Sequence, residues 1–278
     1  MSTKKLIDKK IDSFYSETEE QTRLQVGLGP LEFERNKELI QRYLTKKKSI
    51  ILDVGGGPGI YAEWLAELKH EVHLIDPVVK HVEEAKKRSA KSKNKFNCVL
   101  GEARKLDFPD RYADVIILHG PLYHLQKKNE RLDCLKEAKR ILKPGGIVLG
   151  FAINYTASTM VSLLQGVMRQ KEFFQMCKQE LENGIHEAPA NMPGILPKAF
   201  YHKQEQLQEE FEQATFNVLD IVAVEGMIWL DKNYFASRAD AAIKKRMMEL
   251  LTITERDKNL LSFSPHMMIA AKKQSLRK

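Results

Sequence analysis

Apolar residues gather in short runs along the first half of the chain, and polar or helical stretches separate these runs. Several runs are nearly continuous in Ile, Leu and Val, which is typical of strands buried on both faces of a parallel sheet. The expected strands are Ser49–Val54, His70–Asp76, Phe96–Leu100, Ala113–His119 and Ile147–Ile153. The expected helices between them are Ile60–Leu68, Val79–Ser92 and Asn129–Leu142, the last ended by a stop and turn at Lys143-Pro144-Gly145-Gly146. This alternation predicts a doubly wound α/β sheet with right-handed crossovers.

Two amphipathic helices precede the first strand and occupy most of residues 1–47. Leu6, Ile7, Ile11, Phe14 and Tyr15 recur at helical spacing, and a second helical segment runs from Leu31 to Leu44. We expect these helices to pack over the carboxyl ends of the strands or beside the sheet.

The alternation of strands and helices stops after Asn154. Tyr155 to His202 is helical in pattern and rich in methionine and aromatic residues, so a helical cap over 155–202 is predicted, inserted between strands five and six. The later elements are a helix at Gln204–Gln213, a strand at Phe216–Glu225, a long helix at Ala236–Leu251 and a strand at His266–Ala271. The sheet therefore has seven strands, formed by 48–154 and 203–278.

Composition excludes several classes of protein. Apolar residues make up 43% of the 278 positions, as expected for a chain with a substantial core. Three separated cysteines favour neither a zinc site nor a disulfide framework, and we expect no metal. The charged N-terminus and the lack of a long apolar run predict a soluble, cytoplasmic protein without a membrane span.

The net charge of +8 leaves two interpretations open. The densest basic group is Lys80, Lys86, Lys87, Arg88, Lys91, Lys93 and Lys95. This group fits a solvated helix face, and it also fits a phosphate-binding surface.

The glycine-rich stretch Leu52-Asp53-Val54-Gly55-Gly56-Gly57-Pro58-Gly59 follows the first strand. Such a turn lets a ligand approach the backbone closely, because no Cβ blocks it. The spacing differs from the G-x-G-x-x-G loop of dinucleotide sites, and Asp53 would repel a pyrophosphate. A carboxylate there attracts an ammonium and a sulfonium, which S-adenosylmethionine carries. We therefore expect a methyl-donor site.

Three further strand ends offer groups for the same donor, at the edge where open α/β sheets bind ligands. Asp76, followed by Pro77, can accept both ribose hydroxyls. Glu102, Ala103 and Arg104 can recognise adenine, and the turn His119-Gly120-Pro121-Leu122-Tyr123-His124 lies beneath the methyl group. Each acid taken alone also fits a helix cap. The expected donor-binding residues are Asp53, Gly55, Gly56, Gly57, Gly59, Asp76, Pro77, Glu102, Ala103, Arg104 and His119.

These motifs together resemble the class I S-adenosylmethionine-dependent methyltransferases. Leu52–Gly59 resembles the family's first motif, Asp76 its second, Glu102-Ala103 its adenine-contacting pair and Lys143–Gly146 the turn before strand five. The resemblance implies a Rossmann-like seven-stranded methyltransferase sheet and S-adenosylmethionine as cofactor. Gly120-Pro121-Leu122-Tyr123-His124-Leu125 is similar to bacterial small-molecule enzymes near the ubiquinone/menaquinone-biosynthesis type, except that an apolar residue is more usual at His119. The asparagine-proline-proline-aromatic motif of amino-directed nucleic-acid enzymes is absent.

Catalytic candidates come from the end of the fourth strand. Methyl transfer depends on alignment, and a general base is needed only for a hydroxyl or an acidic carbon. His124, His119 and Tyr123 are candidates for that base, although Tyr123 and His124 also fit local packing. Tyr15 and Arg23 could close over the donor and pair with its carboxylate, or serve only packing and surface charge.

The cap and a tryptophan supply candidates for the acceptor pocket. Trp229 could touch substrate. The apolar residues of the cap fit a core between its helices, and some of them should also line the acceptor pocket. They are Met160, Met168, Phe173, Phe174, Met176, Met192, Phe200 and Tyr201.

Three functions remain open from the sequence. The favoured one is methyl transfer to a small, partly apolar molecule. The alternative is a tRNA-modifying methyltransferase of the kind that esterifies wobble-uridine carboxymethoxy groups, which the chain resembles in its late elements. A non-catalytic donor-binding protein is the third.

Overall fold

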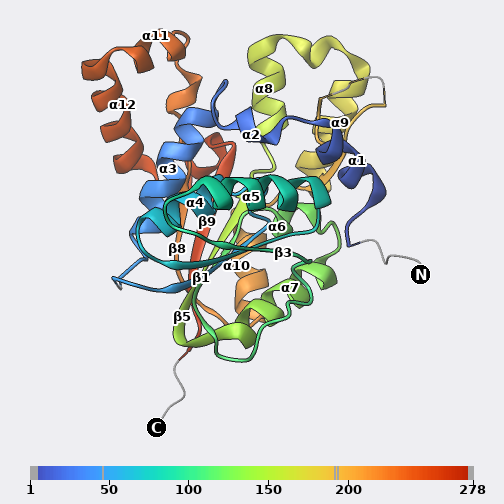
Figure 1. Ribbon diagram of the computed structural model, residues 1–278. Coiled ribbons are helices and arrows are strands. Elements are labelled where there is room, and N and C mark those ends of the chain that lie inside the picture. The colour runs from blue at the N-terminus through green and yellow to red at the C-terminus, as the bar shows by residue number, and fades with distance from the viewer. Residues whose placement is uncertain (1–5, 46, 191, 193, 275–278) are drawn as a thin grey trace.

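A seven-stranded sheet forms the centre of the protein in the computed structural model (Figure 1), which describes residues 6–45, 47–190, 192 and 194–274. The strands are β1 (Ile50–Val54), β2 (Glu71–Asp76), β3 (Asn97–Leu100), β4 (Ala113–Leu118), β5 (Leu142–Ile153), β8 (Asn217–Ala223) and β9 (His266–Lys272). Their spatial order is β3-β2-β1-β4-β5-β9-β8. The first five are parallel, and β9 is antiparallel to both β5 and β8. The predicted α/β sheet of seven strands is confirmed.

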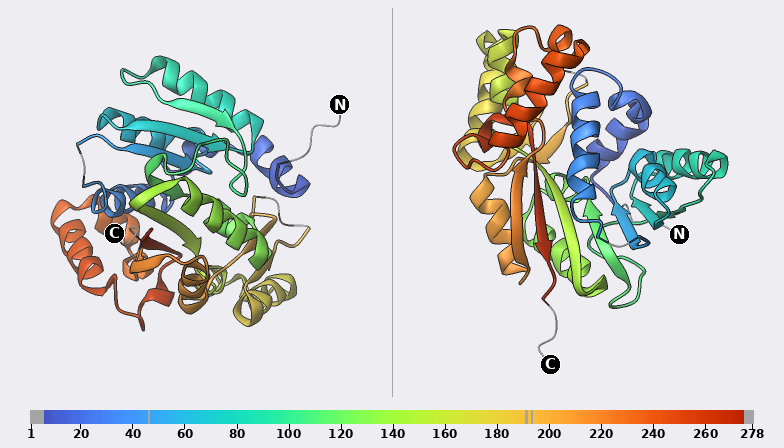
Figure 2. Two further views of the ribbon diagram at one scale, coloured as in Figure 1. Left: turned by 90° about the horizontal axis from the view of Figure 1, so that it is seen from below. Right: turned by 90° about the vertical axis from the view of Figure 1, so that its left-hand side faces the viewer.

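Helices cover both faces of the sheet, as Figure 2 shows. One face packs on α3 (Gly29–Gln41), α4 (Ile60–Glu67) and α5 (Val79–Lys91). The other packs on α6 (Pro121–His124), α7 (Lys128–Ile141) and α10 (Gln204–Gln213). Neighbouring residues Ile51 and Leu52 of β1 point into opposite clusters, and both are fully buried. Burial on both faces explains the continuous apolar runs of the sequence.

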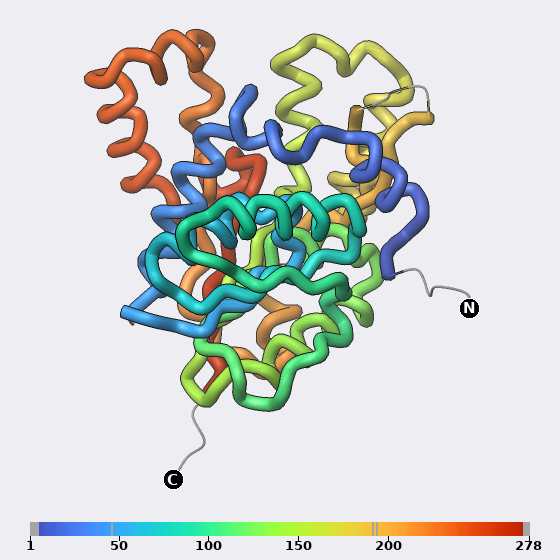
Figure 3. Tube along the Cα trace, in the orientation of Figure 1, coloured from blue at the N-terminus to red at the C-terminus, as the bar shows by residue number. Residues whose placement is uncertain are grey.

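The N-terminal segment crosses the edge formed by the carboxyl ends of the parallel strands (Figure 3). It contains α1 (Lys9–Glu17) and α2 (Glu20–Arg23), and it leads into α3 beside the sheet. Lys80 of α5 holds this segment by donating to the carbonyl oxygens of Ser16 and Thr18. One lysine of the basic group therefore ties two elements together.

Residues 155–202 contain more than the predicted helices. They include α8 (Ala157–Gln165) and α9 (Lys171–Asn183), followed by a two-stranded antiparallel ribbon of β6 (Ile185–Glu187) and β7 (Lys198–Phe200). The sequence predicts that Pro189, Pro193 and Pro197 break the helical pattern in the latter part of this segment, but it does not predict the ribbon found there. The prolines there interrupt helical hydrogen bonding, and the ribbon supplies the backbone pairs instead.

Two other expectations need correction. Lys143–Gly146 lies inside β5, where the register against β4 shifts, so it is an irregularity of the strand that follows α7 directly. The long late helix is two helices, α11 (Tyr234–Ala239) and α12 (Ala241–Thr254). Asp240 separates them because its carboxylate caps α12 by accepting from Ala242 N and Ile243 N. No helix in the described part of the chain has the length and hydropathy of a membrane span.

Candidate functional site

A cavity of about 760 Å³ opens at the carboxyl ends of β1, β2 and β4, beneath the N-terminal segment. Most of the site residues expected from sequence line it. These are Tyr15, Arg23, Gly55, Gly56, Gly57, Asp76, Pro77, Glu102, Ala103, Arg104, His119, Tyr123 and His124. Strand ends far apart in sequence therefore meet at one place, as the topology of parallel strands requires.

The glycine turn after β1 forms one wall of the cavity. Gly55 and Gly57 have φ values of +76° and +55°, which favour glycine. A Cβ on Gly57 would have only Glu20 Cγ within 4 Å, at 3.9 Å, so the backbone is open toward the cavity. Gly59 has a different role, because a Cβ there would stand 3.1 Å from the Phe96 ring. Gly59 is not among the residues that line the cavity, and its expected donor contact stays a prediction.

Asp76 ends β2 and arranges the neighbouring backbone. Its Oδ2 accepts from Gly57 N and its Oδ1 from Val78 N, each at 2.9 Å. His81 Nδ1 lies 3.1 Å from Oδ1. Carboxylate oxygens have two lone pairs each, so Asp76 retains capacity to accept hydrogen bonds from a ligand.

The adenine-site candidates form a small ion-pair network after β3. Glu102 accepts from Arg104 Nε at 2.7 Å, and Arg104 Nη1 donates to Glu130 at 2.8 Å. Ala103, which lies between Glu102 and Arg104 in the sequence, is buried and lines the cavity. Glu130, from α7, had no sequence signal of its own.

Asp53 lies behind the cavity wall rather than in it. Its side chain is fully buried and its Oδ1 is 2.8 Å from His119 Nδ1. The expected contact between Asp53 and the donor stays a prediction, and in this structure the carboxylate faces His119. Strand geometry explains the result, because Asp53 points to the side of β1 where His119 stands at the end of β4.

Tyr15 and His124 meet although 109 positions separate them. The Tyr15 hydroxyl is 3.0 Å from His124 Nε2. Burial lowers the pKa of His124 to about 4, and burial also raises the pKa of Tyr15. The neutral imidazole and the tyrosine hydroxyl therefore share one hydrogen bond, which fastens α1 to α6.

Arg23 is paired with two carboxylates at the cavity wall. Its guanidinium donates to Glu32 through two nitrogens, at 2.6 and 2.9 Å, and to Glu20 at 2.5 Å. Its side chain is 44% exposed, so a ligand can still reach it. Burial opposes ionisation of Glu32, but Arg23 and His266 lower the pKa of Glu32 to about 2.

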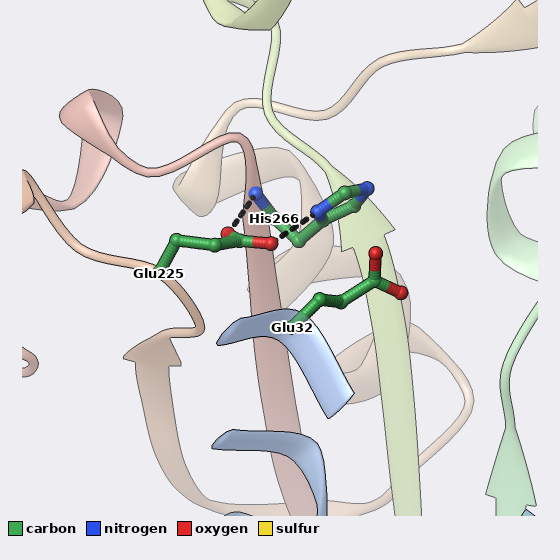
Figure 4. A group of neighbouring side chains, drawn as sticks. All are labelled: Glu32, Glu225 and His266. Atoms are coloured by element: carbon green, nitrogen blue, oxygen red, sulfur yellow. Dashed lines mark hydrogen bonds and ion pairs between the residues drawn. The ribbon is translucent and has the colours of Figure 1, made fainter. Parts of the chain in front are cut away.

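Glu32, Glu225 and His266 form a cluster that the sequence did not indicate (Figure 4). Glu225 accepts from His266 Nδ1 at 2.7 Å and from the His266 backbone N at 3.0 Å. Their carboxylate and imidazole atoms suit a metal ion by type. However, Arg23 on Glu32 and the charged His266 already supply positive charge. The cluster is thus balanced by the protein's own cations.

His266 should make the stability of the protein depend on pH. Burial disfavours the charged imidazole, but Glu225 outweighs burial and raises the pKa of His266 from 6.5 to about 9. Its stabilising contribution is full below pH 6.5 and disappears as pH rises through 9. We expect His266→Gln to lose on the order of 2 kcal/mol at pH 6 and much less at pH 10. Urea unfolding at both pH values measures this, and an equal loss at both would contradict it.

The apolar residues proposed for the acceptor pocket lie elsewhere. None of the eight cap residues lines the cavity, and from 155–202 the described lining residues are Gly194 and Leu196. Trp229 is buried beside Tyr234 and Leu251, and its indole donates to Phe263 O at 2.7 Å. Its expected contact with substrate stays a prediction. Lining residues missed from sequence include Asn36, Tyr61, His81, Phe151 and His266.

Comparisons with known proteins agree with this geometry. Residues 52–150 match the family described as "Methyltransferase domain". The chain is similar to "Probable tRNA methyltransferase 9B" of Bos taurus, with 30% identity over 111 residues, 38% of this chain. It spans only 22% of the length of that relative.

A second sequence relative and a solved structure cover more of the chain. A demethylmenaquinone methyltransferase of Staphylococcus aureus is 26% identical over 202 residues, covering 67% of this chain and 77% of that protein. The crystal structure of a SAM-dependent methyltransferase from Methanosarcina mazei shares the fold, with a TM-score of 0.59 and 19% identity. That match covers 86% of this chain and 98% of the other.

Proposed function

We propose that this class I S-adenosylmethionine-dependent methyltransferase transfers its methyl group to a small-molecule acceptor. The observation that carries the proposal is the covered cavity. The helices α1 and α2 lie over the strand ends, and the cavity volume of about 760 Å³ suits a donor plus a compact acceptor. The similarity to a demethylmenaquinone methyltransferase supports a small-molecule acceptor.

The residues in the cavity fit S-adenosylmethionine. The open backbone at Gly57 can lie against its amino-acid part, and Asp76 can accept the ribose hydroxyls. Ala103 and Arg104 would contact the adenine, and Arg23 would pair with the carboxylate. The donor supplies a methyl group already activated by a sulfonium. The protein's task is to align the acceptor with that methyl carbon and to exclude water.

The segments have proposed roles that follow from this site. We propose that 1–47 closes over the donor, that 48–154 and 203–278 form the methyltransferase domain, and that 155–202 is a cap. The cap reaches the cavity through Leu196, and it would act on the acceptor from that side.

Replacing Asp76 tests donor binding directly. We expect Asp76→Ala to weaken binding of S-adenosylhomocysteine by about 1–3 kcal/mol, because hydrogen bonds to a charged group are lost. Isothermal titration calorimetry measures the change, starting from roughly micromolar affinity.

The matched control is Asp133→Ala, an acid on α7 whose side chain is 55% exposed and remote from the cavity lining. Normal affinity of the Asp76 variant would refute the ribose assignment. Absence of any binding by the unmodified protein would refute the proposed function.

A tRNA acceptor is the second candidate, supported by the similarity to tRNA methyltransferase 9B and by the net charge of +8. Phosphate contacts release counterions, so tRNA methylation should fall steeply with salt, whereas a small acceptor should show little dependence. Incubating labelled donor with fractionated extract at 50 and 200 mM salt, and measuring the label in tRNA and in small molecules, separates the two candidate acceptors. Label in tRNA with a steep salt slope would favour the second candidate.

A further inference from the structure

His119 stands at the carboxyl end of β4 with its ring held in a fixed plane. The ring is stacked between Tyr61, with centroids 4.3 Å apart, and Phe151, with centroids 4.8 Å apart; both interplanar angles are 22°. The side chain is 10% exposed and lines the cavity. Such a ring has little rotational freedom, so its two nitrogens have defined directions.

The two nitrogens of His119 have different surroundings. Nδ1 faces Asp53 Oδ1 at 2.8 Å. Because an ionised carboxylate only accepts, the neutral imidazole carries its proton on Nδ1 and a lone pair on Nε2. Nε2 is buried and has no hydrogen-bond partner among the described residues. A buried nitrogen without a partner retains its capacity to bind a ligand group, and that of His119 belongs to a side chain that lines the cavity.

The position of His119 relative to the glycine turn indicates what Nε2 can reach. A Cβ on Gly55 would stand 3.0 Å from Gly120 N, so the turn after β1 contacts the end of β4. A donor lying along the turn places its reactive end beside His119. The surrounding wall is aromatic, with Tyr61, Phe151 and Tyr123 among its residues. A flat ring carrying a hydroxyl suits this wall and this lone pair.

We propose that His119 is the general base for a hydroxylated aromatic acceptor, with Asp53 as its positioning residue. The inference rests on the proposed function. Nε2 takes the hydroxyl proton while the acceptor oxygen forms a bond to the methyl carbon. The carbon–sulfur bond breaks, and its electron pair stays on the leaving sulfur. The imidazolium is balanced by Asp53 and later returns the proton to water.

Turnover tests the proposal with defined probes. Purified protein and labelled S-adenosylmethionine are incubated with catechol and 1,2-dihydroxynaphthalene, and with o-phenylenediamine as an amine that needs no base. We expect label on oxygen of a hydroxyarene. His119→Gln should lower kcat/KM for it roughly 100-fold and remove the acidic limb of the pH profile. His73→Gln, at a histidine outside the cavity lining, is the control and should change neither.

A second readout does not depend on turnover. In ¹⁵N-histidine NMR of the complex with S-adenosylhomocysteine, His119 should carry its proton on Nδ1, and Asp53→Asn should redistribute the tautomers. Calorimetry should show that His119→Gln loses far less affinity for S-adenosylhomocysteine than the roughly 100-fold that it loses in kcat/KM.

Four results would overturn the inference. They are a proton on Nε2 in the complex, loss of S-adenosylhomocysteine affinity equal to the loss of turnover, full turnover in His119→Gln, and no label on any hydroxyarene. In each of these cases binding of S-adenosylhomocysteine by the unmodified protein would leave the proposed function intact. Absence of that binding would instead remove the function itself.

Discussion

Gly57→Val is expected to weaken S-adenosylhomocysteine binding roughly 1,000-fold, about 4 kcal/mol. The φ of Gly57 is +55°, which a β-branched residue adopts only with strain. The added side chain would also project between the glycine turn and Glu20, where the cavity is open. The amide of Gly57 donates a hydrogen bond to Asp76, so a displaced turn would also disturb the ribose site.

The control for Gly57→Val separates strain from occlusion. Gly166 has a φ of +69°, no atom within 4 Å of an added Cβ, and a position outside the cavity lining. Gly166→Val should therefore lose a similar amount of stability while binding normally. Calorimetry with both variants, together with their thermal unfolding, provides the comparison. Equal affinities in the two variants would show that the glycine turn does not face the donor.

Arg131→Met should destabilise the fold by about 3–5 kcal/mol, because it leaves Glu210 charged and buried without its guanidinium partner, with His202 Nε2 3.4 Å away as the neighbour that remains. Arg131 and Glu210 are each 2% exposed, and the guanidinium donates to Glu210 through two nitrogens at 2.6–3.1 Å. Arg131 also donates to the carbonyl oxygens of Leu125 and Gln126, directly after α6. The loss should therefore loosen the turn that carries His119 to His124.

Urea unfolding measures the effect of Arg131→Met. Lys136→Met on the same helix is the matched control, since its side chain is 64% exposed and its ion pair with Asp133 should contribute little. Adding Glu210→Gln to Arg131→Met should recover part of the loss by removing the unpaired charge. A variant as stable as the Lys136 control would show that the pair is not needed for the fold.

Local pattern was enough to predict the sheet, and most of the site residues predicted from it line the cavity. Apolar runs and helical periodicity placed every strand of the main sheet to within a few residues, apart from the start of β5. Acids and glycines at strand ends were then assigned to one edge because parallel strands must end together. Asp76, Glu102 and the turn at Gly120 are found there.

The errors arose where the local pattern has two solutions. Prolines in the cap ended helical periodicity but could not indicate that β6 would pair with β7. Methionines and aromatics at helical spacing fit a pocket wall and a core equally well. Asp53 has the expected position in sequence. The direction of its side chain, however, depends on which neighbouring residue donates a hydrogen bond to it.

The sequence by itself determined the succession of strands along the chain, the glycine turn after β1, and the acids at or just after the carboxyl ends of β1, β2 and β3. These features depend on backbone preferences and on periodicity over a few residues, so they can be recognised from neighbouring residues alone. Only the tertiary structure decided which side chains meet: His119 with Asp53, Tyr15 with His124, and His266 with Glu225. Such pairs join residues 41 to 109 positions apart. They form because packing brings their elements together, and because a buried polar group is stabilised by a hydrogen-bond partner.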